Sequence, residues 1–134
     1  MKIKSTLPAA LGAAFLASIV AQQAVGAVGE EDFALETTED LYQICSATAD
    51  DPNYIHAAYE CRGFIEGAVQ YHDAVSDKKH LKRLICYPES ATIGDGKKAF
   101  VAWAKKHSGD KEAMGELPVV GLVRALADKY PCKR

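Results

Sequence analysis

The sequence predicts a small all-α domain of four helices joined by short turns and stapled by disulfides. Three observations support this fold class. Apolar residues in the C-terminal three quarters of the chain recur at spacings of three and four, which is the helical period. The alternation of apolar and polar residues that is typical of strands is almost absent. The chain contains four cysteines, an even number, as a disulfide framework requires.

The first 27 residues have the three-part pattern of a secretory signal peptide. Lys2 and Lys4 supply the positive charge, residues 7–20 form an uncharged apolar run, and residues 25–27 are small. The run is shorter than the roughly 20 residues that span a bilayer, so we expect cleavage and no membrane contact afterwards. An N-terminal membrane anchor is the alternative.

Charge argues against a nucleic-acid-binding protein. Removing residues 1–27 takes away Lys2 and Lys4 and no acidic residue, so the mature chain has 14 basic and 18 acidic side chains. Its formal charge is then −4. Proteins that bind nucleic acids present a basic face to the phosphates, and a mildly acidic domain is a poor candidate for that function.

The cysteines are expected to form structural disulfides. Cys45, Cys61, Cys86 and Cys132 all lie in the mature part of the chain. Export to an oxidising compartment favours disulfides in a small domain. A zinc site or a thioredoxin-type redox site usually has a C-x-x-C pair, and the sequence contains none. Four cysteines allow three connectivities, among which the sequence alone does not decide.

The mature chain begins with an acidic segment at 28–37, which is expected to form a loose arm ahead of a helical domain at 38–134. Thr37 or Thr38 caps the first helix. Acidic residues follow in its first turn, where negative charge is favourable.

A second, long helix is expected over residues 52–76. Asp51 is a natural N-cap and Pro52 a natural first residue. Apolar residues, among them Tyr71, form two adjacent stripes along it. Such a wide apolar face predicts a central helix that contacts several neighbours.

Two further helices are expected near the C-terminus. The first covers residues 93–107 and is capped by Thr92 or Ser90. The second covers residues 118–130 and ends where Pro131 prevents its continuation.

The helix layout favours one disulfide connectivity. Cys45 lies near the end of the first helix and Cys61 early in the second, so both are close to one hairpin apex. Cys86 precedes the third helix and Cys132 follows the fourth. In an antiparallel helix pair these two positions lie side by side. The layout therefore predicts Cys45–Cys61 and Cys86–Cys132.

Residues that carry chemistry are scattered. The four histidines lie in different segments, and none belongs to a recognisable nucleophile motif. His72 and Asp73 are neighbours on a helix and are expected to point away from each other. Gly94-Asp95-Gly96-Lys97 lacks the remaining positions of a phosphate-binding loop. We therefore expect neither an enzyme nor a metal or cofactor site.

Several landmarks occur in the order of a known family. Leu41-x-x-x-Cys45 precedes Cys61-x-x-Phe64-Ile65-x-Gly67, and both precede Cys86-Tyr87-Pro88. A last helix ends in Ala125-Leu126-x-x-x-Tyr130-Pro131-Cys132. In this order the sequence resembles the Rap/Tai family of immunity proteins, which protect bacteria from amidase effectors of type VI secretion systems. The match covers about residues 38–132, and its landmarks are scaffold residues.

The resemblance implies an exported, periplasmic, disulfide-bonded protein, often a homodimer, that binds a peptidoglycan-degrading amidase and blocks its active-site cleft. In the family a loop between the later helices is thought to enter that cleft. The matching segment here is residues 107–117, a polar stretch that is expected to hold one short turn around residues 110–114. The implied contact residues are His107, Ser108, Asp110, Lys111 and Glu112.

Two other functions remain open at this stage. A periplasmic helical scaffold or chaperone-like binding protein of the same fold would lack a toxin partner, because a fold does not fix a function. A hydrolase would need a cleft that brings a histidine and a nucleophile within hydrogen-bond reach.

Overall fold

The computed structural model describes residues 26–78 and 81–133, so most of the expected signal peptide at 1–27 lies outside the described residues. The described residues are helical and contain no strand, which confirms the all-α fold class. The elements in chain order are η1 (Glu31–Ala34), α1 (Thr38–Ser46), α2 (Tyr54–Lys78), α3 (Ile93–His107), α4 (Lys111–Gly115) and α5 (Pro118–Lys129).

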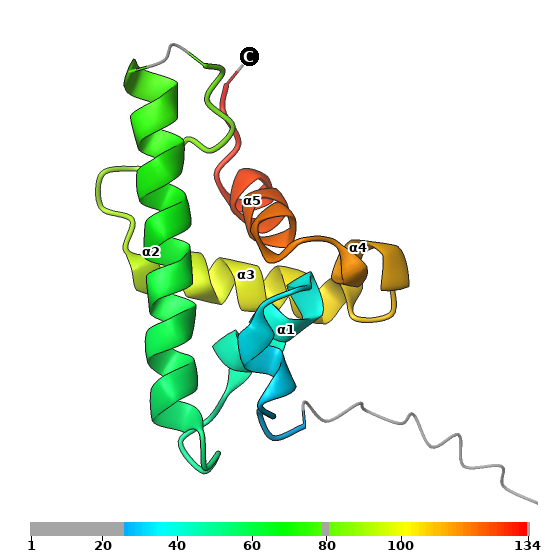
Figure 1. The fold of residues 1–134 in the computed structure, drawn as a ribbon. Coiled ribbons are helices and arrows are strands. Elements are labelled where there is room, and N and C mark those ends of the chain that lie inside the picture. Colours follow the sequence, from blue (N-terminus) through cyan, green and yellow to red (C-terminus); the bar gives the residue numbers. More distant parts are fainter. Residues whose placement is uncertain (1–25, 79–80, 134) are drawn as a thin grey trace, which may run out of the picture.

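The short helix α1, rather than the long helix α2, is the centre of the fold. It contacts η1 and all four of the other α-helices, whereas α2 makes most of its contacts with α1 and α3. Figure 1 shows α2 upright along one side of the molecule, with α3 running across it and α5 beside the end of the chain. The long helix therefore covers one side of the core and leaves its opposite face to solvent.

Helices α1, α2, α3 and α5 each contribute one or two large side chains to the core. Leu41 and Ile44 of α1, Ile65 of α2, Phe100 of α3 and Leu122 of α5 are completely buried. Full burial of such a side chain contributes roughly 1.5–3 kcal/mol relative to leaving it exposed.

Two threonines cap the N-termini of α1 and α3, the helices that contact the largest number of other elements. Thr37 accepts a hydrogen bond from the backbone N–H of Asp40, whose carboxylate accepts one from the Thr37 N–H. Thr92 and Asp95 form the same reciprocal capping box at the start of α3. Each box satisfies backbone N–H groups that a helix start leaves without partners. The capping threonines are therefore Thr37 and Thr92 among the candidates that the sequence offers.

The two disulfides join the pairs that the helix layout predicts. Cys45–Cys61 links the end of α1 to α2, and its two Cα atoms are 5.1 Å apart. Cys86–Cys132 ties the segment before α3 to the residues after α5, with a Cα–Cα distance of 4.9 Å. Both cross-links therefore hold segments that are separate in sequence.

The acidic segment at 28–37 differs from the loose arm that its composition predicts. Val28 is buried against the core, and its backbone N–H donates to the Asp51 carboxylate at 2.8 Å. The side-chain amide of Asn53 donates to the Val28 carbonyl at 2.9 Å. These partners lie more than twenty residues away along the chain, so local composition gave no indication of them.

The boundaries and faces of α2 also differ from expectation. The helix begins at Tyr54 and continues to Lys78, two residues later than predicted at each end. Tyr71, which the pattern places on the apolar face, is 72% exposed. An apolar stripe wider than the core can cover leaves its edge in solvent.

Candidate functional site

The segment that follows α3 forms an exposed corner of the molecule. Residues 108–112 are exposed and His107 is half-buried; we call residues 107–112 the corner segment. It connects α3 to the short helix α4, which corresponds to the expected turn around residues 110–114 (Figure 1). Ala113 and Met114 are buried and hold α4 to the core. The corner segment is therefore exposed to solvent, and the buried residues of α4 that follow it fix it to the core.

Three side chains of the corner segment make local hydrogen bonds. The His107 ring stacks on Trp103, with centroids 4.2 Å apart, and its Nδ1 lies 2.7 Å from the Trp103 carbonyl oxygen. The Ser108 hydroxyl donates to the Lys105 carbonyl. The Asp110 carboxylate accepts hydrogen bonds from the N–H groups of two following residues and caps α4. These bonds hold the corner in one conformation.

Lys111 and Glu112 have a different environment. Both side chains are exposed, and neither takes part in an ion pair or side-chain hydrogen bond within residues 26–78 and 81–133. The corner thus offers a cation, an anion and a serine hydroxyl on a rigid base. These side chains can bind a polar protein surface. Because the loop is already ordered in the free protein, binding does not need to order it.

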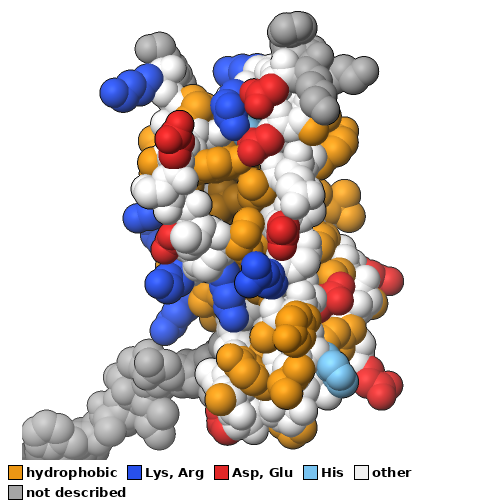
Figure 2. Space-filling view, turned by 90° about the vertical axis from the view of Figure 1, so that its left-hand side faces the viewer, with side chains coloured by type: hydrophobic (Ala, Val, Ile, Leu, Met, Phe, Trp, Pro, Cys, Tyr) orange, Lys and Arg blue, Asp and Glu red, His pale blue; other side chains and the backbone are white. Residues whose placement is uncertain are grey.

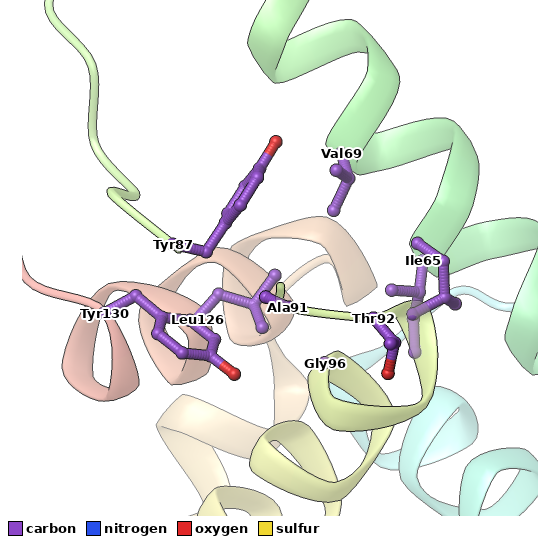
Figure 3. Close-up of a pocket in the computed structure, with 9 residues that line it drawn as sticks. Ile65, Val69, Tyr87, Ala91, Thr92, Gly96, Leu126 and Tyr130 are labelled. Carbon is purple, nitrogen blue, oxygen red and sulfur yellow. The ribbon is translucent and has the colours of Figure 1, made fainter. Parts of the chain in front are cut away.

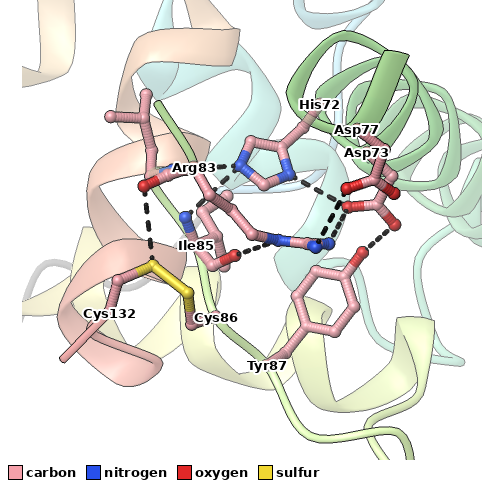
Figure 4. Close-up of polar contacts among 9 residues, drawn as sticks. His72, Asp73, Asp77, Arg83, Ile85, Cys86, Tyr87 and Cys132 are labelled. Carbon is pink, nitrogen blue, oxygen red and sulfur yellow. Dashed lines mark hydrogen bonds and ion pairs between the residues drawn. A yellow bond between two sulfur atoms is a disulfide. The ribbon is translucent and has the colours of Figure 1, made fainter. Parts of the chain in front are cut away.

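A second polar group, which the sequence did not indicate, lies at the other end of the molecule. The carboxylate of Asp73 accepts hydrogen bonds from the Tyr87 hydroxyl and from Arg83, whose Nη2 is 2.7 Å away (Figure 4). Arg83 also lies 3.3 Å from the Asp77 carboxylate. The cluster attaches the segment before α3 to the C-terminal half of α2.

His72 belongs to this cluster and corrects one sequence-based expectation. Its Nδ1 is 3.1 Å from Asp73 Oδ1, although the two residues were expected to point apart. Its Nε2 accepts hydrogen bonds from the backbone N–H groups of Leu84 at 3.2 Å and Ile85 at 3.3 Å (Figure 4). Because Nε2 is an acceptor, the ring proton is on Nδ1 and points to Asp73.

The cluster shifts the pKa of several of its members, Asp73 and Tyr87 among them. Burial alone would raise the pKa of Asp73, but hydrogen bonds from Tyr87 and His72 and the charge of Arg83 outweigh burial and lower it. Burial and the hydrogen bond to Asp73 raise the pKa of Tyr87 to about 12. The histidine and its neighbours use their polar atoms on one another and on the backbone, as structural networks do.

A small apolar cleft lies between α2 and the segment after Tyr87. Ile65, Val69 and Leu126 line it, and the rings of Tyr87 and Tyr130 meet edge to face with centroids 6.4 Å apart (Figure 3). Figure 2 shows the cleft as a hollow with a hydrophobic floor. Its volume of about 40 Å³ is far below the roughly 300–1,000 Å³ of small-molecule sites. The cleft therefore does not define a metabolite site.

Within the part of the chain that the structure describes, no three His, Cys, Asp or Glu residues are grouped so that they could hold a metal ion. Among the same residues, no helix has the length and apolar character needed to cross a membrane.

The fold and the corner define a disulfide-stapled helical protein whose exposed polar features suit the binding of another protein. Residues 37–132 match the family described as Rap1a immunity proteins. The chain therefore belongs to the Rap1a immunity protein family, and it is an immunity protein that binds a secreted effector. No curated protein and no solved structure matches the chain significantly.

Proposed function

We propose that this protein is a periplasmic immunity protein that binds and inhibits a peptidoglycan-degrading amidase effector of a type VI secretion system. Membership of the Rap1a family supports the immunity function. The two disulfides fit an exported protein, because disulfides persist in oxidising compartments such as the periplasm. The expected signal peptide at residues 1–27 belongs to the same proposal.

The corner segment carries this proposal. It projects from the end of α3, is exposed from Ser108 to Glu112, and is held beneath by the buried Met114. A protruding segment of this kind can enter a concave active site, whereas a flat binding surface cannot. In the proposed complex Ser108, Lys111 and Glu112 contact the walls of the amidase cleft and exclude the substrate. His107 and Asp110 maintain the conformation of the corner.

The proposal predicts that a neighbouring gene encodes the amidase, and a calorimetric titration with that amidase tests it. Ser108→Tyr with Lys111→Glu is expected to raise the Kd at least tenfold, which corresponds to about 1.4 kcal/mol. The paired variant Lys82→Glu with Lys133→Glu changes exposed lysines far from the corner in sequence and is expected to bind like the parent. Equal affinities for the parent and the corner variant reject the corner segment as the binding site.

The resemblance also implies a homodimer, and we propose that the outer face of α2 forms it. Ile55, Tyr59 and Tyr71 are 65%, 74% and 72% exposed. Gly63 and Gly67 lie between the tyrosines at intervals of four. Apart from their chain neighbours and the backbone of α2 itself, no atom of the described residues lies within 4 Å of the position that a Cβ atom would take on either glycine. We call these five residues the α2 stripe; hydrophobic side chains reach the surface along this helix in Figure 2.

Within the α2 stripe, Tyr59 and Gly63 are related to Tyr71 and Gly67 by symmetry about the point midway between the glycines, which suits a two-fold interface. In an antiparallel pair of α2 helices centred between Gly63 and Gly67, the glycines allow close approach and each tyrosine covers the partner. Sedimentation velocity tests this arrangement. Gly63→Arg is expected to convert the dimer to a monomer, whereas Gly115→Arg, at another glycine without neighbours, is expected to leave it unchanged. A parent protein that sediments as a monomer rejects the dimer.

A further inference from the structure

A groove runs between the end of α1 and the outer face of α3. Its volume is about 670 Å³, within the roughly 300–1,000 Å³ of small-molecule sites. Tyr42 and Cys45 of α1 and Val101 and Ala102 of α3 provide an apolar floor. This α1–α3 groove is distinct from the corner segment, although the end of α3 leads directly into that segment.

The charged residues along the groove all have the same sign. Lys97, Lys98 and Lys105 line it, and no acidic residue does. Among residues 26–78 and 81–133, none of these lysines is within salt-bridge distance of a carboxylate. The mature chain is acidic overall, so the positive charge on this face is a local concentration. Asp95 is close enough to attract Lys98, so Lys97 and Lys105 supply most of the unbalanced charge. Such charge attracts a surface of the opposite sign.

A buried hydroxyl in the same groove lacks a partner. Ser46, the last residue of α1, lines the groove, and its Oγ is buried without a hydrogen bond in the described part of the chain. A buried hydroxyl without a partner is unfavourable by about 1–3 kcal/mol. A polar atom of a bound partner supplies the missing hydrogen bond only if the Ser46 side chain first rotates into the groove.

The opposite side of α3 extends the same surface. A second groove of about 500 Å³, between α3 and α5, is lined by Trp103, Lys106 and Lys129. It shares Lys98 and Ala102 with the α1–α3 groove, so these two residues lie on a ridge between the grooves. Asp95 and Asp128 line the second groove and balance part of its charge. The α1–α3 groove is therefore the more strongly basic of the two.

We propose that the α1–α3 groove binds an acidic, partly apolar segment of the effector protein. The lysines pair with its carboxylates, and the floor around Tyr42 and Val101 accepts its apolar side chains. The proposal rests on the effector binding that defines the family, and it does not require the effector to be an amidase.

A peptide titration followed by ¹H–¹⁵N NMR tests the groove without an effector. The probe is a short synthetic peptide of alternating Glu and Leu, and the matched probe alternates Lys and Leu. The Glu–Leu peptide is expected to shift the amide resonances of Ser46, Lys97, Val101 and Lys105 saturably. The Lys–Leu peptide is expected to leave them in place. Shifts spread over the whole surface, or none at these residues, overturn the proposal.

Two variants separate the groove from general charge attraction. Lys97→Gln with Lys105→Gln is expected to weaken binding of the Glu–Leu peptide at least tenfold while circular dichroism stays unchanged. Lys82→Gln with Lys133→Gln removes the same charge elsewhere and is expected to retain at least half of the affinity. Equal losses in both variants overturn the proposal.

The same Lys97/Lys105 variant distinguishes a second copy of this chain as the occupant. If it dissociates a dimer in sedimentation velocity, the groove is an interface between copies and the effector proposal is wrong. The peptide result does not depend on amidase inhibition, so a failure here leaves the proposed function intact. Loss of amidase binding in the corner variant alone leaves the groove intact.

Discussion

The side chain of Thr38 occupies the space beside Gly121 that any larger residue would need. A Cβ atom on Gly121 would lie 2.3 Å from Thr38 Cγ2 and 2.5 Å from Oγ1. Thr38 is completely buried, and its hydroxyl is 3.1 Å from the carbonyl oxygens of both Glu116 and Leu117. The start of α1 is therefore packed directly against α5 and the turn before it.

The close approach of Thr38 to Gly121 predicts a large effect of one added methyl group. Gly121→Ala is expected to destabilise the protein by about 1–3 kcal/mol, because the new Cβ overlaps a side chain that is itself held by hydrogen bonds. Urea denaturation measures the change. Gly115→Ala is the control and is expected to be neutral or slightly stabilising, since nothing lies near that position. Equal stabilities of the two variants contradict the packing of α1 on α5.

The disulfides predict a strong dependence on redox conditions. The bonded cysteines are 16 and 46 residues apart in sequence. In the chain-entropy model these cross-links contribute about 3 and about 4 kcal/mol. For a domain of ordinary stability, about 5–15 kcal/mol, this is a large share. Reduction is expected to lower the midpoint of urea denaturation clearly. Mass spectrometry verifies that all four thiols are free. An unchanged midpoint in the fully reduced protein would show that these disulfides do not stabilise the fold.

The hydrogen bonds of His72 predict that its ring holds the segment before α3. Its Nε2 accepts hydrogen bonds from the N–H groups of Leu84 and Ile85. His72→Ala removes this acceptor, so amide exchange at Leu84 and Ile85 is expected to accelerate at constant pH, because both N–H groups lose their partner. Hydrogen exchange by NMR measures the change.

A glutamine variant provides the control for His72. His72→Gln keeps an uncharged acceptor at this position, so its amide exchange at Leu84 and Ile85 is expected to stay closer to that of the parent than in His72→Ala. Unchanged exchange in His72→Ala means that His72 does not hold this segment.

The hydrogen bond between Tyr87 and Asp73 predicts a loss of stability at alkaline pH. The pKa of Tyr87 in the folded protein is about 12, against an ordinary value of 10.0. A raised pKa means that the folded state favours the protonated phenol. The contribution of Tyr87 to the free energy of unfolding is therefore complete below pH 10 and is lost as the pH rises through 12. Ultraviolet titration measures the pKa of Tyr87. The Tyr87→Phe variant is expected to lack the loss of stability that this phenol causes at alkaline pH. Asp73→Asn is expected to return the pKa towards 10.

Local signals in the sequence predict most of the helical framework. The third helix has the predicted bounds, 93–107, because Thr92 provides a strong cap and polar residues follow the helix. The last helix begins at Pro118 as predicted and ends one residue early. Both disulfide pairs follow from the order of the helices alone. Caps and prolines act within a few residues, so a single sequence contains what is needed to find them.

Features that depend on distant partners could not be predicted. Val28 is held by Asp51 and Asn53, and Asp73 is held by Arg83 and Tyr87. In both cases the partners are ten or more residues away, and their meeting depends on the packed fold. The corner segment was inferred from a resemblance and not from its own residues, whose charges are ordinary for a surface turn. Its contact with an effector therefore stays a prediction.

Release of peptidoglycan fragments by the proposed amidase partner tests the central claim most directly. The purified, oxidised protein is predicted to stop the release at an equimolar ratio, and the Ser108→Tyr, Lys111→Glu variant is predicted to need at least a tenfold higher concentration. Undiminished release in the presence of excess parent protein would contradict the account.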